Sequence, residues 1–509
     1  MQQSIADKGL LAIILLAIFV VPSSISGTAV ALPAIGLDIH APLTSLQWVV
    51  NAFNLTFACF TLSWGAVADN FGRKTCFSLG AVLYALASLL SALADSPMLL
   101  DLSRALAGIG AAAVFSCGIA ILSTRFEGAA RLRAFALFGT VAGLGVSLGP
   151  TLSGVILEHF SWRAIFWCHT LALLLVLLGS AIIPRDLPAI GQRLQFDTVG
   201  ASLFILLLLA LMTAIVQSSQ WGWNSQGILL LLALAVATLA LFIWQEKRHP
   251  NPMLDLSLLT NQRFVGMALV TVAASFGFVT LLTYLPSYLG GVLQLAPTRT
   301  GLTMLLLTLP MLICPLLAGK LVAHGVSANR VLNASLLSLL LGIILLAAFS
   351  NPSSTWWQLA LPMLLLGCGM GLSAGLVDGM ALKMVPAEKA GMAAGLLNTF
   401  RLGSEAVAVA LYGSLLATLL GDAAHGALTT LSSNAEQIHG WINAAAAGNL
   451  AAPAPMALAS QLQSILIKGY DQAFHGVLWL LAAIILLLTG LIAWLIRPAM
   501  PATEASQPL

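Results

Sequence analysis

Gly-Ala-Val-Ala-Asp-Asn-Phe-Gly-Arg-Lys, residues 65–74, is the most informative stretch of this chain. It joins two long apolar segments, 45–68 and 75–94, and so predicts a short polar hairpin between two membrane spans. Gly65 is small enough to let helices approach closely, and Gly72 allows a tight turn. The chain is therefore predicted to cross a membrane repeatedly.

Charges of both signs follow in the same hairpin. Asp69, Arg73 and Lys74 lie where they can pair with a neighbouring helix end at the membrane surface. The stretch closely resembles the loop signature of the major facilitator superfamily, Gly-x-Leu-Ala-Asp-x-x-Gly-Arg-Lys, between its second and third helices. The resemblance implies a cytoplasmic latch that holds the carrier outward-open, formed by Gly65, Asp69, Gly72, Arg73 and Lys74. An ordinary charged turn is the alternative.

Composition points to a membrane protein independently. The chain is 59% hydrophobic and 8% charged, whereas soluble domains carry about 25% charged residues. All six cysteines lie in or beside apolar segments, which predicts neither disulfides nor a thiolate metal site. No cofactor, no metal and no nucleic-acid partner is predicted, and we expect a transporter rather than an enzyme.

Fourteen apolar segments are long enough to span a membrane. With the N-terminus inside, most of the 21 Lys and Arg residues fall in segments on the inner side, as the positive-inside rule predicts for fourteen spans with both termini cytoplasmic. Only Arg163, Arg299 and Lys468 fall outside, and Arg104 and Arg401 lie within spans. The predicted spans are 10–35, 45–68, 75–94, 98–122, 134–157, 163–183, 196–217, 226–245, 263–287, 299–323, 330–350, 355–382, 391–419 and 473–496.

The order of these spans predicts an all-α polytopic protein with two six-helix bundles and two additional helices. We expect an N-terminal bundle at 1–188, a two-helix insert at 189–250 and a C-terminal bundle at 251–509. The last part includes one long loop, 421–472, on the outer side. A degenerate copy of the hairpin at 319–325 supports the two bundles as repeats.

A second motif lies in the fifth predicted span. Gly145-Val-Ser-Leu-Gly149-Pro150-Thr-Leu-Ser-Gly154 places small residues where helices can pack closely. It resembles the antiporter motif of the same superfamily, Gly-x-x-x-Gly-Pro-x-x-Gly-Gly, and this resemblance implies an exporter rather than an uptake carrier. A packing groove for any helix pair is the alternative.

Arg104 begins a third motif, Arg-Ala-Leu-Ala-Gly-Ile-Gly-Ala, which resembles the family pattern Arg-x-x-Gln-Gly-x-Gly-Ala. The resemblance implies a role for Arg104 in proton coupling. From the residues alone, Arg104 can also extend to the membrane surface or pair with Asp101 one turn earlier.

Ionisable residues deep in a span are functional candidates because they are costly to insert. Arg401 and Glu405 lie near the middle of the thirteenth span, and their spacing places them on one helical face, where they can pair. We interpret Glu405 as a proton or cation site, with mutual neutralisation of the two charges as the alternative. Asp378 is a second carboxylate candidate, unless it pairs with Lys383 or caps its helix.

The first span departs from the family. It resembles Leu-Asp-x-Thr-Ile-Val-Asn-Val-Ala-Leu-Pro, yet Ser24 stands at the place of the aspartate. Ser24 is thus a cavity candidate without the carboxylate that is linked to cationic drugs, which weakens the expectation of dicationic substrates.

The resemblance extends over essentially the whole chain and implies a fourteen-helix drug:proton antiporter in a bacterial inner membrane. No nucleotide-binding loop is present, so an ion gradient must supply the energy. The expected partners are protons, a small amphipathic substrate and the lipid bilayer, with a periplasmic adaptor and an outer-membrane channel as further candidates. An exporter of an endogenous metabolite or a siderophore is the alternative.

Overall fold

The computed structural model describes residues 5–126, 128–184, 197–250, 256–374, 376–382, 390–450 and 456–496. Within these residues, 13 helices are long and apolar enough to cross a membrane. The predicted span 45–68 corresponds to α2 (Leu43–Phe71), which is not among the 13. The prediction of an all-α polytopic fold is confirmed.

The first half of the chain supplies six long helices, which we call the N-terminal helices, followed by a helical pair. The pair, α7 and α8, corresponds to the predicted insert. The bounds are α1 (Ile5–Asp38), α2, α3 (Arg73–Ala92), α4 (Pro97–Arg125), α5 (Gly128–His159), α6 (Arg163–Gly179), η1 (Ser180–Ile182), α7 (Thr198–Trp221) and α8 (Gln226–Glu246).

The second half contains the remaining helices, some short and some, such as α16 and α18, very long, and we call them the C-terminal helices. A π-helical turn, η3, joins α9 to α10 in one continuous span. The bounds are η2 (Leu256–Thr260), α9 (Gln262–Ala274), η3 (Ser275–Val279), α10 (Thr280–Gly291), α11 (Pro297–Thr308), α12 (Pro310–Ala323), α13 (Ala328–Phe349), α14 (Trp356–Ser373), α15 (Leu376–Leu382), α16 (Ala390–Leu428), α17 (Ala435–Ala446) and α18 (Met456–Leu495).

Side-chain caps fix where several of these helices begin. The hydroxyls of Ser96, Ser225 and Ser327 each accept a hydrogen bond from a backbone N–H in the first turn of α4, α8 and α13. Asn261 caps α9 in the same way. These caps satisfy N–H groups that a helix leaves unpaired, so they define the helix starts beside otherwise continuous apolar sequence.

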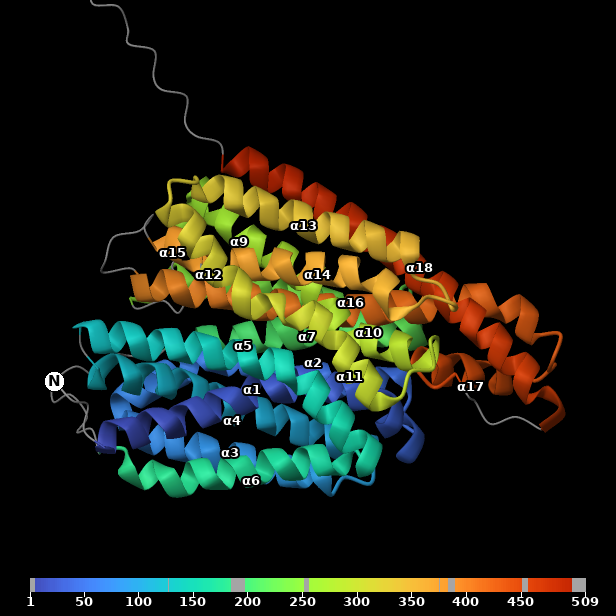
Figure 1. The fold of residues 1–509 in the computed structure, drawn as a ribbon, viewed down its shortest axis with the longest axis horizontal. Coiled ribbons are helices and arrows are strands. Elements are labelled where there is room, and N and C mark those ends of the chain that lie inside the picture. Colours follow the sequence, from blue (N-terminus) through green and yellow to red (C-terminus); the bar gives the residue numbers. More distant parts are fainter. Residues whose placement is uncertain are drawn as a thin grey trace, which may run out of the picture.

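The helices run side by side along the long axis of the molecule (Figure 1). The N-terminal α3, α4 and α6 lie on one side, and α13, α14 and α18 lie on the other. The described start of α1 and the short helix α17 lie at opposite ends. We call the latter the α17 end.

The predicted loop 421–472 is largely helical within the described residues. α16 continues to Leu428, and α18 already begins at Met456. Between them, the amphipathic α17 buries Ile438, Trp441 and Ile442. The predicted boundaries near 188 and 251 lie outside the described residues, so the division into bundles and insert stays a prediction.

The orientation of the chain in the membrane is testable at Ala435, the first residue of α17. In a variant without the six native cysteines, we expect Ala435→Cys to react with a membrane-impermeant maleimide added to intact cells. The matched Thr75→Cys, beside the Lys74 hairpin, is expected to react only after the cells are broken. Protection of position 435 together with labelling of position 75 would reverse the predicted orientation.

Candidate transport site

The hairpin at residues 65–74 forms as predicted. Gly72 ends α2 and precedes α3 with φ 93°, a backbone conformation that favours glycine. The Lys74 ammonium donates hydrogen bonds to the carbonyls of Ala181, at 3.1 Å, and Ile183, so it caps the end of α6 and η1. Gly65 and Asp69 lie in α2, and their side chains are not among those that the structure describes.

Glycines of α5 bring this helix into close contact with α1. A Cβ atom at Gly145 would lie 2.6 Å from the Phe19 carbonyl oxygen, and one at Gly149 would lie 2.2 Å from the Ser26 hydroxyl. Pro150 lies inside the same helix. The two glycines therefore serve packing between neighbouring N-terminal helices.

Gly154 has a different partner, because it faces α11 among the C-terminal helices. A Cβ atom there would lie 2.4 Å from the Pro297 carbonyl oxygen, and one at Gly301 would lie 2.6 Å from the Pro150 carbonyl oxygen. Glycine on both sides lets the two backbones touch. The antiporter-like motif thus forms part of a contact between the two halves, which we call the α5–α11 seam.

Hydrogen bonds reinforce this seam. Ser147 donates to the Thr308 carbonyl at 2.8 Å, and Thr308 donates back to the Ser147 carbonyl at 3.1 Å. Thr151 donates to the Gly301 carbonyl at 3.0 Å. Such hydroxyl-to-carbonyl bonds between helices replace water that the membrane interior does not provide.

Residues of both halves also meet at the α17 end of the molecule. A cavity of about 360 Å³ there is lined from both halves, by Pro33 and Leu157 on one side and Pro286 and Pro297 on the other. The loop after α17 contributes Gly448, whose added Cβ would lie 3.1 Å from both Pro33 and Ser287. The contacts between halves described here therefore gather toward the α17 end.

The Arg104 side chain takes neither of the two positions that were predicted from the residues alone. It neither reaches the membrane surface nor pairs with Asp101, but is 1% exposed inside the N-terminal helices. Its guanidinium donates to the Val49 carbonyl and to the Ser24 hydroxyl, both at 3.0 Å. It also lies 4.5 Å from the centre of the Phe53 ring.

Ser24 and Arg104 are thus direct neighbours, at the position where the family pattern would place a carboxylate. The acceptors of Arg104 within the described residues, the Val49 carbonyl and the Ser24 hydroxyl and carbonyl, are all neutral. A serine hydroxyl satisfies the hydrogen bond without neutralising the charge. The site consequently presents a buried positive charge rather than a buried ion pair.

Arg401 forms an ion pair with Asp378, whereas the sequence spacing suggests Glu405 as its partner. One guanidinium nitrogen lies 2.8 Å and 3.0 Å from the two Asp378 oxygens. The residues face a cavity of about 170 Å³ together with Thr271 and Ser373. A helix spacing of four allows a pair but does not enforce it, and the carboxylate of α15 lies better placed.

Glu405 is the acid left over by this pairing. It is partly buried on α16 and has no ion-pair or hydrogen-bond partner within the described residues. One residue before it, Ser404 donates to the Ser275 hydroxyl at 3.0 Å, exactly where the π turn η3 begins. Since π turns are frequent at functional sites, this contact adds η3 to the surroundings of Glu405.

The comparison with known proteins decides the family. The sequence profile of the Major Facilitator Superfamily matches residues 14–409. The chain belongs to this superfamily. Members act as transporters of small molecules within membranes, which agrees with the helices and seam described above.

Two curated relatives of this major facilitator are resistance proteins. Multidrug resistance protein Stp of Mycobacterium tuberculosis is 33% identical over 77% of this chain and 72% of its own length. Puromycin resistance protein pur8 of Streptomyces alboniger is 32% identical over 77% of this chain and 78% of its own length. The major facilitator is therefore related to exporters of drugs and antibiotics.

A solved structure supports the fold. A bacterial homologue of the human lysosomal transporter Spinster, in an inward-facing and unoccupied conformation, has a TM-score of 0.66 at 15% identity. The alignment covers 98% of this major facilitator and all of that chain.

Sequence reasoning overlooked several polar residues of this major facilitator. Tyr288 on α10 donates to Asp471 at 2.6 Å, and His475 lies 3.7 Å from the same carboxyl group. Three amides on α2, Gln47, Asn51 and Asn54, are also buried. Their spacing of four and three residues is visible in the sequence and marks one helical face.

The α5–α11 seam yields a prediction. Gly154→Val places side-chain atoms against the Pro297 carbonyl, so we expect the two helices to separate at the α17 end. Spin labels are attached at the exposed positions 159 and 299, and the distance between the two labels is measured by double electron–electron resonance. This distance should be longer in the variant than in the parent. Gly139→Val, where nothing lies within 4 Å of an added Cβ, is the matched control. Equal distances in all three proteins would show that the seam does not depend on this glycine.

The Arg401–Asp378 pair yields a second prediction. Asp378→Asn and Arg401→Gln should each lower the thermal stability of the purified protein, and the double variant should lose less than the sum. Because both side chains are partly exposed, at 25% and 40%, we expect a coupling free energy of only about 1 kcal/mol. Strict additivity of the two losses would contradict the pair.

Proposed function

We propose that the chain is a proton-coupled antiporter that exports amphipathic drugs or toxic compounds across the bacterial inner membrane by alternating access. The names of the relatives support drug export, since one is a multidrug and the other a puromycin resistance protein. The distribution of basic residues supports a cytoplasmic position for both termini and an outer position for the α17 end.

One observation supports proton coupling: the Glu405 carboxyl group has no ion pair and no hydrogen bond among the described residues. A carboxylate inside a membrane helix without an ionic partner among the described residues is costly when charged, so it favours gaining a proton. Opposite access states can then change its surroundings and release that proton. Glu405 is our candidate for the proton carrier.

The α5–α11 seam supplies the conformational part of the proposal. With the seam closed, the route toward the α17 end is packed by Gly154, Gly301 and the hydroxyl pair Ser147 and Thr308. Export requires this contact to part while the opposite side closes. In that second state, the hairpin latch at Asp69 and Arg73 would hold the halves together on the cytoplasmic side.

The surroundings of Arg104 and Ser24 affect which charge a substrate can carry. A buried guanidinium with neutral acceptors repels a dication, and it favours neutral, zwitterionic or anionic groups. We therefore include Arg104 in the coupling machinery as a fixed positive charge. The periplasmic adaptor and outer-membrane channel stay a proposal that rests on the need to cross a second membrane.

The role of Glu405 is tested in proteoliposomes that hold puromycin and a pH gradient. Glu405→Gln keeps the size of the side chain but cannot exchange a proton. Uphill efflux of puromycin should therefore fall to the level of vesicles that contain no protein. Downhill exchange of labelled for unlabelled puromycin should persist. The parent protein should export faster as the proton gradient grows, whereas the variant should be insensitive to it.

Asp378→Asn is the control for this experiment. Glu405→Gln leaves the Arg401–Asp378 pair intact, so a loss in the glutamine variant cannot be assigned to a stranded guanidinium. If Glu405→Gln pumps uphill while Asp378→Asn does not, the proton carrier is Asp378. If both pump against the gradient, neither carboxylate couples transport to protons.

A further inference from the structure

Three amide side chains form a stripe on α2. Gln47, Asn51 and Asn54 are separated by four and three residues, so they project from one face of the helix. They are 1%, 0% and 2% exposed. We call these residues the amide stripe.

The stripe points away from the N-terminal helices. The opposite face of α2 makes the contacts within that half, because the Val49 carbonyl accepts from Arg104 and Thr56 donates to the Ala105 carbonyl at 2.8 Å. The stripe instead meets α16. A Cβ atom on Gly413 would lie 2.0 Å from the Gln47 side-chain nitrogen.

Most polar atoms of the stripe lack a hydrogen bond of good geometry in the present arrangement, although the Gln47 amide lies near the Tyr284 hydroxyl. Both side-chain polar atoms of Gln47 and of Asn51, and the nitrogen of Asn54, are buried without a hydrogen-bond partner among the described residues. Buried amides are normally paired, because leaving them dry and unpaired is unfavourable. Three such groups in a row indicate that partners arrive in another state of the carrier.

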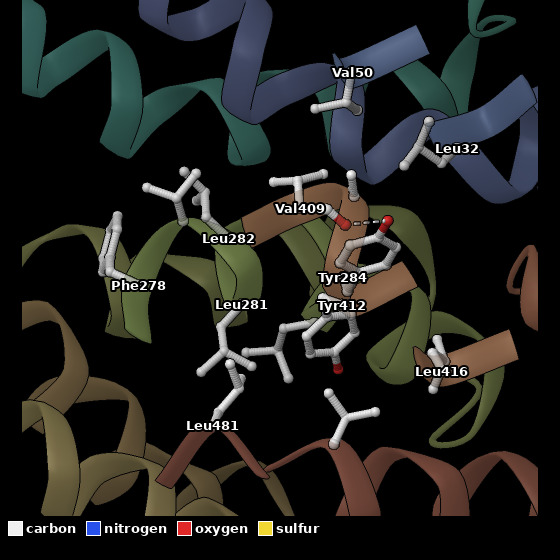
Figure 2. Close-up of a cluster of buried hydrophobic side chains, with 14 of the residues drawn as sticks. Leu32, Val50, Phe278, Leu281, Leu282, Tyr284, Val409, Tyr412, Leu416 and Leu481 are labelled. Carbon is white, nitrogen blue, oxygen red and sulfur yellow. Dashed lines mark hydrogen bonds between the residues drawn. The ribbon is translucent and has the colours of Figure 1, made fainter. Parts of the chain in front are cut away.

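Aromatic rings lie beside the stripe on the C-terminal side. Tyr284 and Tyr412 stack with ring centres 4.5 Å apart, and the Tyr284 hydroxyl donates to the Val409 carbonyl at 3.0 Å (Figure 2). The Tyr412 hydroxyl is buried without a partner among the described residues. Tyr412 lies on α16 and Tyr284 on the neighbouring α10. In Figure 2 both rings lie between the ribbon of α2 and that of α18.

Charged groups are set apart from this surface. Arg104 binds the opposite face of α2. Glu405 is about two helical turns along α16 from Gly413, and Arg401 is a further turn away. The surface between α2 and α16 therefore offers amide donors and acceptors, a phenolic hydroxyl and ring faces.

We propose that Gln47, Asn51 and Asn54 form a substrate-binding surface for uncharged hydrogen-bonding groups, namely hydroxyl, carbonyl and amide groups carried by a ring-bearing compound. The surface becomes available when α2 and α16 part toward the α17 end. There, each amide can donate to and accept from the passing compound, while the tyrosine rings contact its planar part. This inference rests on the proposed export function and adds the class of groups that are recognised.

The test compares two compounds in proteoliposomes with a pH gradient. Puromycin carries many hydroxyl, amine and amide groups, whereas tetraphenylphosphonium has aromatic rings but no hydrogen-bonding group. Asn51→Leu should lower puromycin efflux about five- to tenfold, as expected for the loss of one or two hydrogen bonds. Tetraphenylphosphonium efflux should stay within about twofold of the parent by the same argument.

Thr56→Val, on the opposite face of α2, is the matched control and should affect the two compounds equally. Asn51→Leu removes an unpartnered amide, so its thermal stability should equal or exceed that of the parent. Asn54→Leu provides a second, independent variant with the same expected selectivity.

Two outcomes would overturn the proposed surface. An equal fall for both compounds would mean that the stripe governs opening of the carrier rather than recognition, and unchanged puromycin efflux would mean that it does neither. A parent protein that exports the phosphonium but not puromycin also contradicts it. A parent protein that exports neither compound would refute the proposed export function itself.

Discussion

The close approach of α5 and α11 joins the two halves of the molecule backbone to backbone. Backbone reaches backbone at Gly154 and Gly301, because neither residue carries a side chain that would hold the helices apart. The hydroxyls of Ser147 and Thr308 can then bond across the same contact. A seam built from small residues and from the hydroxyls of Ser147, Thr151 and Thr308 is suited to open and close, because polar bonds of this kind can be exchanged for others.

The ionisable residues within the helices have three different environments. Arg401 has a carboxylate partner in Asp378, whereas Arg104 donates to the Ser24 hydroxyl and to backbone carbonyls. Glu405 has neither kind of partner within the described residues. These three environments separate the tasks of stabilising a helix pair, supplying a fixed positive charge and exchanging a proton.

Much of this architecture could be predicted from the sequence, because membrane spans and motifs depend on local composition. The hairpin glycine at 72, the helical fold and the packing role of the α5 glycines follow from residue size and hydropathy. Partners across helices could not be obtained in this way. The spacing of Arg401 and Glu405 fixes a shared face but says nothing of Asp378 on a separate helix, and Arg104 turned inward because Ser24 and Val49 offered acceptors there. The amide stripe shows the same limit, since its period is visible in the sequence but its contact with α16 is not.

Coupling between the drug and the proton is the central claim, and proton movement tests it most directly. Vesicles containing the reconstituted protein and a trapped pH-sensitive dye are given an inward-acid or outward-acid gradient, and puromycin is then added. Antiport predicts that puromycin accelerates the collapse of the gradient, in proportion to the drug transported, and that Glu405→Gln removes this acceleration. Transport of puromycin with no change in the proton flux would contradict the account.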